Sequence, residues 1–228
     1  MEEEEVKILS IAIPCYNSAA YMRRCIDSLL PGGDDVEILI VDDGSAKDDT
    51  AEIADEYEKN YPGIVRAIHQ ENGGHGEAVN AGLRNATGLY YKVVDSDDWV
   101  DEDAYLEIIR TLKELVAGPE TVDMFISNFV YDKVGAKRKK VMRYGAFPEN
   151  EIFHWEEAKK TAHWSLHIDA FRDLPYHASS GVRAGASKAY VLCGQSVCIP
   201  AAALCKKSLL SKSEFLSLFY RTGRSVGE

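Results

Sequence analysis

The sequence lacks the features that would assign it to several common classes of protein. It has no uninterrupted apolar run of about 18 residues, so we expect no transmembrane helix, although peripheral membrane association is compatible with it. It also lacks an excess of positive charge, because 37 acidic and 26 basic residues give a net charge of -11. That balance disfavours nucleic acid as a partner, since a phosphate backbone demands clustered Lys and Arg.

Neither the cysteine pattern nor the first residues of this sequence are typical of a secreted protein. The five cysteines are odd in number and form no CxxC pair, so neither a disulfide framework nor a zinc site is expected. Met1 is followed by four glutamates, the opposite of the basic start of a secretory signal. We therefore expect a cytoplasmic protein.

Short apolar runs alternate with helix-like segments through the first half of the chain. Strands are expected over residues 7–14, 37–42, 64–69 and 89–94, separated by helices over 19–30, about 50–60, and from the turn at 72–76 to about 86. This alternation is typical of a mostly parallel sheet flanked by helices. A helix from Asp101 to Gly118, a strand over 122–130 and a hairpin partner over 137–143 are expected to follow.

The composition changes abruptly near residue 174. Residues 174–228 carry seven Lys and Arg against only Glu214 and Glu228, whereas residues 1–173 carry 35 acids against 19 bases. Apart from a candidate helix over 209–220, this tail has no clear helix or strand period. We divide the chain into residues 1–130, residues 131–173 and an irregular tail (174–228), and we expect this tail to be truncated or poorly ordered.

An acidic cluster follows the expected strand at 89–94. Asp95, Ser96, Asp97 and Asp98 stand at its carboxyl end, where open α/β sheets bind ligands. Carboxylates gathered in this way offer oxygen ligands to Mg²⁺ or Mn²⁺. The alternative is an acidic turn that only caps the helix beginning near Asp101.

Two more motifs lie at expected strand ends. Asp42 and Asp43, followed by Gly44, could accept hydrogen bonds from a ribose hydroxyl or a base imide, or could simply form an Asx turn. The glycine-rich segment 72–76 leads into a helix whose N-terminus favours phosphate, but it lacks the lysine of a P-loop. His75, within this segment, is more typical of a loop histidine than of a catalytic one.

The order and spacing of these motifs are more specific than any one of them. Over residues 7–110 the sequence resembles family 2 of the glycosyltransferases, on the strength of Pro14, Tyr16, Asn17, the Val41–Ser45 segment, Asn72–Gly74, Ala78, Asn80, Gly82, Gly88 and the Asp95–Asp98 cluster, a DXD motif. The resemblance implies a GT-A fold of Rossmann-like α/β type. It also implies inverting transfer of a sugar from a nucleotide diphosphate sugar, commonly a UDP-sugar, to a saccharide or glycolipid acceptor in polysaccharide biosynthesis.

The resemblance further implies that residues 1–130 form the nucleotide-sugar-binding half and that residues 131–173 begin the acceptor half. It also implies roles for individual residues. The nucleotide would be bound by Pro14, Tyr16, Asn17, Asp42, Asp43, Gly74, Asn80 and Asp95. Asp97, with Asp95, would hold the Mn²⁺ or Mg²⁺ ion, and Asp98 would face the donor sugar.

The family's catalytic base has no clear counterpart here. A carboxylate must deprotonate the acceptor hydroxyl, and Asp169 and Asp173 are weak candidates for it. The alternative function is therefore a nucleotide-sugar-binding remnant without its base. A sugar nucleotidyltransferase is disfavoured, because Pro14–Asn17 is not the basic, glycine-rich loop expected after its first strand.

Overall fold

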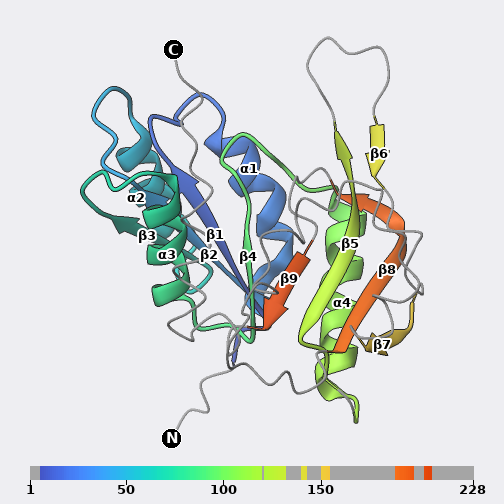
Figure 1. The fold of residues 1–228 in the computed structure, drawn as a ribbon. Helices are drawn as coiled ribbons and strands as arrows, with labels where there is room; N and C mark the ends of the chain where they lie inside the picture. Colours follow the sequence, from blue (N-terminus) through green and yellow to red (C-terminus); the bar gives the residue numbers. More distant parts are fainter. Residues whose placement is uncertain are drawn as a thin grey trace, which may run out of the picture.

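One β-sheet runs through the part of the chain that the structure describes. The computed structural model describes residues 6–119, 121–131, 140–142, 150–154, 188–197 and 203–206. Their strands follow the order β3-β2-β1-β4-β9-β5-β8-β7, with β6 paired to β5 outside this path (Figure 1).

The first half of the sheet is parallel. It consists of β1 (Leu9–Cys15), β2 (Val36–Asp42), β3 (Val65–His69) and β4 (Tyr90–Val93), with β1 between β2 and β4. Every residue of β1 and β2 is buried, as expected for strands covered on both faces. The predicted α/β fold with a mostly parallel sheet is confirmed here, and each of these strands agrees with its expected range to within two residues.

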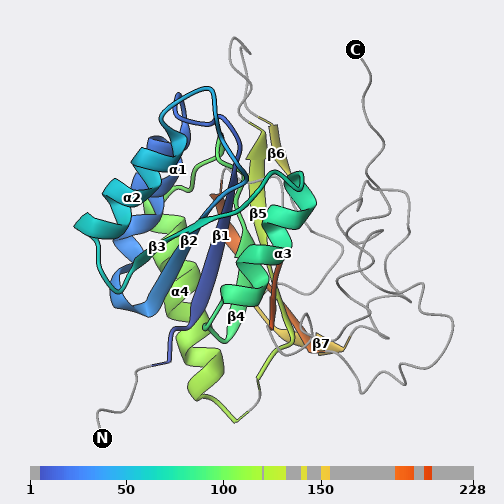
Figure 2. The same cartoon turned by 90° about the vertical axis from the view of Figure 1, so that its left-hand side faces the viewer.

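Helices cover both faces of this parallel half. Ile11 and Ile13 of β1 face a core shared with α1 (Met22–Leu29), α2 (Thr50–Asn60) and α4 (Glu102–Ala117). Ala12 points the other way, toward Leu83 of α3 (His75–Asn85). Figure 2 shows α3 on the opposite side of the sheet from α1 and α4. The alternation of side chains along each strand thus builds two cores.

The second half of the sheet mixes directions. It contains β5 (Met124–Tyr131), β6 (Lys140–Met142), β7 (Ile152–His154), β8 (Lys188–Val197) and β9 (Ala203–Lys206). The expected hairpin between β5 and β6 is present and antiparallel. Strands β8 and β9 lie in the tail where the sequence showed no strand period, and β9 pairs antiparallel with both β4 and β5. The domain boundaries and the candidate helix over 209–220, which lies outside the described residues, remain predictions.

The helix ends follow local chemistry. Helix α1 is followed by a 3-10 segment, η1 (Leu30–Asp35), which begins at the residue where the expected helix over 19–30 ends. Pro31 lies at the start of this segment, and Gly33 within it adopts a positive φ of 54°. Helix α4 starts where Asp101 accepts a hydrogen bond from the Ala104 N–H at 3.1 Å. Asp101 thus supplies the cap, which leaves the preceding cluster free for another role. No helix among the described residues is long and apolar enough to cross a bilayer.

Gly82 allows α3 to approach the sheet closely. A Cβ placed there would lie 2.5 Å from the Ala12 Cβ and 2.9 Å from the Tyr91 hydroxyl. We expect Gly82→Ala to lower the free energy of unfolding by about 1–3 kcal/mol through overpacking. Urea denaturation measures this change in the free energy of unfolding. A gain in stability would contradict the clash, because Ala is favoured over Gly in a helix where nothing obstructs its methyl group.

Candidate active site

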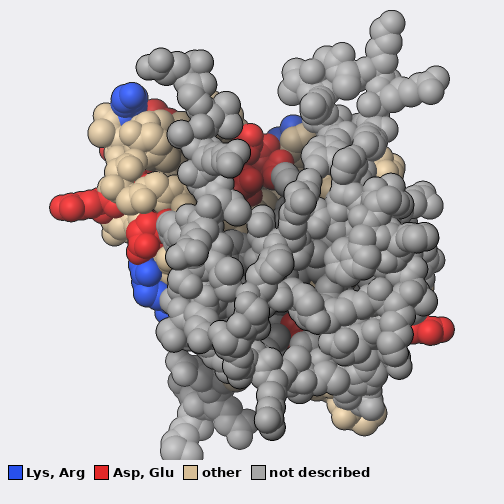
Figure 3. Space-filling model, viewed as in Figure 1, with Lys and Arg blue, Asp and Glu red and all other residues tan. Residues whose placement is uncertain are grey.

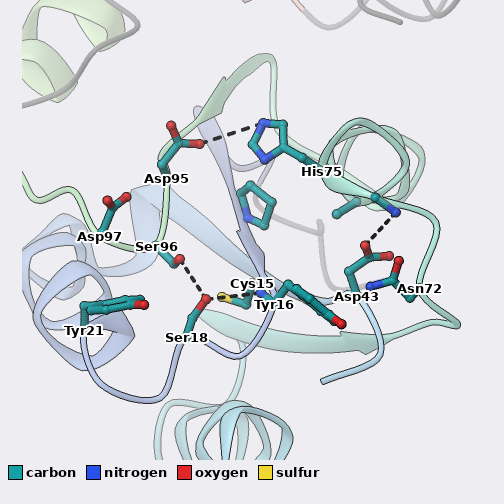
Figure 4. A pocket seen from close by; sticks show the side chains of 13 residues that line it. Cys15, Tyr16, Ser18, Tyr21, Asp43, Asn72, His75, Asp95, Ser96 and Asp97 are labelled. Carbon is teal, nitrogen blue, oxygen red and sulfur yellow. Dashed lines mark hydrogen bonds and ion pairs between the residues drawn. The ribbon is translucent and has the colours of Figure 1, made fainter. Parts of the chain in front are cut away.

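The loops after β1, β2 and β4 meet the start of α3 at the carboxyl edge of the parallel strands. They line a cavity of about 510 Å³, a size suited to a small-molecule ligand (Figure 4). Its walls are formed by Pro14, Cys15, Tyr16, Ser18, Tyr21, Asp43, Asn72, Gly74, His75, Ala78, Asp95, Ser96 and Asp97. Figure 3 shows acidic side chains gathered near the edge at which these strands end.

The loop after β1 is shaped by Asn17, which adopts a positive φ of 50° that Asn tolerates well. Its backbone N–H donates to Ser45 Oγ at 2.9 Å, and its side-chain oxygen accepts from the Lys47 N–H at 3.1 Å. These bonds fasten the loops after β1 and β2 together. Tyr16 beside it is 52% exposed and lines the cavity, so its ring is available to a ligand.

Asp43, immediately after β2, lies between that strand and the glycine-rich loop. One carboxylate oxygen accepts from Gln70 Nε2 at 2.6 Å and from the Gly73 N–H at 2.8 Å. The other accepts from the Gly74 N–H at 2.8 Å. The carboxylate therefore fixes the loop and, with accepting capacity left on the second oxygen, still borders the cavity.

Asp42 faces away from the cavity. Its carboxylate accepts from the Ser45 N–H at 3.0 Å and lies 3.1 Å from His69 Nδ1. Burial disfavours the charged form of His69, yet its contacts with Asp42 and Asp55 raise its pKa overall. Asp42 thus has a local structural role: it accepts from the N–H three residues on, one residue further than in the Asx turn considered above.

The acidic cluster forms a tight turn after β4, closed by the Asp98 N–H donating to the Asp95 carbonyl at 2.9 Å. Ser96 at its centre donates to Ser18 Oγ at 2.9 Å, which ties the turn to the loop after β1. Asp95 and Asp97 line the cavity. Both carboxylates thereby face the space that Tyr16 and Asp43 border.

Asp98 turns inward from the same cluster. Its Oδ2 is buried without a hydrogen-bond partner among the described residues. Burial, followed by the charges of Asp95 and Asp97, raises the pKa of Asp98 to about 7, against the opposing effect of Lys92. The charges of Asp95 and Asp97 thus disfavour the ionised form of Asp98.

The thiol in the cavity is unreactive in this state. Burial, and then the nearby charges of Asp42 and Asp48, raise the pKa of Cys15 to about 12. The thiol consequently stays protonated at neutral pH and is no candidate nucleophile.

The structure brings together part of the predicted site. Six of the predicted residues line the cavity: Pro14, Tyr16, Asp43, Gly74, Asp95 and Asp97. Four others do not, namely Asn17, Asp42, Asn80 and Asp98. Asn80 instead lies within α3, where its side-chain amide donates to Glu77 at 3.4 Å. Asp169 and Asp173 lie outside the described residues.

Several lining residues were not predicted as site residues. Ser96 stands inside the acidic cluster and Ser18 directly follows Asn17, and their mutual hydrogen bond gives a reason for a small hydroxyl at each position. Tyr21, 49% exposed, precedes α1 and lies beside Asp97 in Figure 4. No motif marked Tyr21, because only the folded loop brings it to the cavity.

A divalent cation would fit this site with help from a ligand. No group of three or more His, Cys, Asp or Glu residues suited to a metal occurs among the described residues. However, Mg²⁺ commonly takes one or two carboxylates and completes its shell with water and substrate phosphates. Asp95 and Asp97, both on the cavity wall, provide such a partial ligand set.

Comparison with known proteins agrees with these observations. The model of the family described as "Glycosyl transferase family 2" matches residues 10–176. Glycosyltransferase GlyG of Streptococcus pneumoniae serotype 4 (strain ATCC BAA-334 / TIGR4) is 37% identical over 130 residues, which are 56% of this chain and 41% of that protein. Hyaluronan synthase of Pasteurella multocida is 31% identical over 185 residues, which are 77% of this chain and 17% of that protein.

Among solved structures, S. aureus TarS 1-349 in complex with UDP-GlcNAc aligns with a TM-score of 0.48 and 25% identity, over 57% of this chain and 36% of that one. The chain spans between 15% and 41% of the length of the curated relatives it matches. The family match, over residues 10–176, covers more than half of the sequence. On this match, the chain belongs to glycosyl transferase family 2.

Proposed function

We propose that this chain transfers a sugar from a nucleotide diphosphate sugar, a UDP-sugar in the first instance, to a polysaccharide or glycolipid acceptor with inversion at the anomeric carbon. Membership of the family supports transfer as the reaction. Relatives named chondroitin synthase, from Escherichia coli, and hyaluronan synthase, from Pasteurella multocida, support a polysaccharide product.

One observation supports this donor: the same cavity has a part with an aromatic ring and hydrogen-bond acceptors and another part with two carboxylates. In Figure 4, Tyr16 and Asp43 lie on one side of the cavity, and Asp95 and Asp97 lie on the other. A nucleoside has an aromatic face and hydrogen-bond donors that suit the first part. A diphosphate with a bound cation suits the second, because the cation offsets the repulsion between phosphate and carboxylates.

The cation would be Mn²⁺ or Mg²⁺, held by Asp97 with Asp95. When bound, it would stabilise the charge that develops on the diphosphate. The residues of the chain position it: the turn closed between Asp95 and Asp98 holds both carboxylates on the cavity wall, and Ser96 anchors that turn to Ser18.

Asp169 and Asp173 remain our candidates for the base that takes the acceptor proton. The family match continues to residue 176 and so includes both. That extent supports a transferase over a remnant that only binds the donor. Substituting each aspartate with Asn distinguishes a transferase from a donor-binding remnant. In a transferase, loss of the base should lower transfer by roughly 10²–10⁴-fold without weakening donor binding.

Calorimetric titration with UDP tests the donor site. We expect binding in the presence of Mg²⁺ or Mn²⁺ and much weaker binding with excess chelator, because Asp95 and Asp97 repel a bare diphosphate. Equal affinity under both conditions would refute the cation site. Radiolabelled sugar donors with saccharide acceptors then test transfer, and the anomeric configuration of the product, read by NMR, tests inversion.

A further inference from the structure

His75 is the one potentially cationic side chain among the described residues of the cavity wall. The other ionisable groups there are the carboxylates Asp43, Asp95 and Asp97, the phenols Tyr16 and Tyr21, and the Cys15 thiol; no Lys or Arg lines the cavity in the described part of the chain. A diphosphate in this cavity would thus meet described residues whose charges are all negative, apart from His75. That exception makes His75 the natural partner of a phosphate oxygen.

The position of His75 supports this role. It is the first residue of α3, where the helix dipole favours negative charge. Its Nε2 lies 3.9 Å from Asp95 Oδ1, and its side chain is 65% exposed. In Figure 4 the His75 ring and the Asp95 carboxylate face each other at one end of the cavity. A phosphate bound beside the Asp95 carboxylate would therefore be within reach of the imidazole.

The glycine-rich loop offers less to a phosphate than its sequence indicated. Its Gly73 and Gly74 N–H groups both donate to the Asp43 carboxylate. Because each of these donors already has an anionic acceptor, the loop cannot use them for phosphate without breaking its own anchor. His75, which follows Gly74 directly, offers a side-chain donor beside the loop instead.

We propose that His75 binds the diphosphate of the donor, donating a ring N–H to a phosphate oxygen on the side opposite Asp97. This inference rests on the proposed function, since it assigns a phosphate contact within the same cavity. It gives His75 a binding role distinct from that of the carboxylates, which would hold the cation.

Calorimetry of the full chain with UDP and with uridine, both in Mg²⁺, tests the assignment. His75→Ala should weaken UDP binding by about tenfold to a hundredfold, the range for a hydrogen bond to a charged group, and leave uridine binding unchanged. His75→Gln, which keeps a donor, should retain more affinity for UDP than His75→Ala. Arg84→Gln serves as the matched control, because Arg84 is an exposed cation on the same helix, paired with Glu77 and absent from the cavity wall.

The outcomes separate the two proposals. Wild-type protein that binds no UDP overturns both. Wild-type protein that binds UDP, together with a His75→Ala variant of equal affinity, overturns only the role of His75. If His75→Ala weakens UDP and uridine alike, the residue supports the cavity wall and the phosphate contact is refuted. The ³¹P resonances of bound UDP give a direct check, because they should shift between wild type and His75→Gln.

Discussion

Asp97→Asn is expected to lower sugar transfer by at least about 10²-fold, the scale of losing one preorganised electrostatic group in an active site. Asp97 and Asp95 are the two carboxylates of the β4 turn that line the cavity. An amide in place of Asp97 removes half of the negative charge that would hold the cation. It changes the side-chain volume very little, so the loss reports on charge. The measurement is kcat/KM for the preferred donor, with cation-dependent UDP affinity alongside.

A matched substitution controls for net charge. Asp103→Asn removes one carboxylate from the first turn of α4, where the residue is exposed and does not line the cavity. That variant should transfer sugar at the wild-type rate. If Asp97→Asn transfers sugar as well as Asp103→Asn does, the cation is held elsewhere and our assignment fails.

Glu37→Ala should lower the free energy of unfolding more than Gly82→Ala does. The Glu37 side chain is buried in the sheet, and its Oε1 accepts from Ser10 Oγ at 2.5 Å, from the Thr87 N–H, and from the Gly88 N–H at 3.1 Å. The Gly88 N–H keeps a second acceptor, Ser10 Oγ, when Glu37 is removed. The Thr87 N–H and the Ser10 hydroxyl would each lose Glu37 Oε1, the acceptor described above. With about 1–3 kcal/mol for each unsatisfied donor, the free energy of unfolding should fall by roughly 2–6 kcal/mol.

Glu37→Gln provides the comparison, because the amide oxygen can still accept from these donors in a side chain of the same shape. It should lose clearly less stability than Glu37→Ala in guanidinium denaturation. Equal losses would mean that packing, and not these hydrogen bonds, accounts for the effect.

The sequence predicted the parallel half of the fold well because its signals are local. The buried β-branched runs of β1 and β2 and the amphipathic pattern of α4 specify both the element and the side it buries. Strands β8 and β9 gave no such signal. Their place in the sheet depends on pairing with β5 and β4, far away in the chain, which no local period records.

The contrast between local and long-range signals also explains which residues of the site could be predicted. Strand ends could be placed from the sequence, so Asp43, Asp95 and Asp97 were correctly brought to one edge. Whether a side chain turns toward the cavity or toward the next loop depends on its hydrogen-bond partners. Asn17 and Asp42 both bind the loop that follows β2, and neither partner is apparent before the loops are folded.

The antiparallel insertion of β9 has a consequence for how the protein emerges from the ribosome. Residues 203–206 lie between β4, which ends at Val93, and β5, which begins at Met124. Until those residues leave the exit tunnel, the nascent chain exposes a strand edge on β4 that is able to pair with other chains. Pairing at this edge of β4 thus waits until residues 203–206 have been translated, long after β4 itself, and a chaperone would be most useful in that interval.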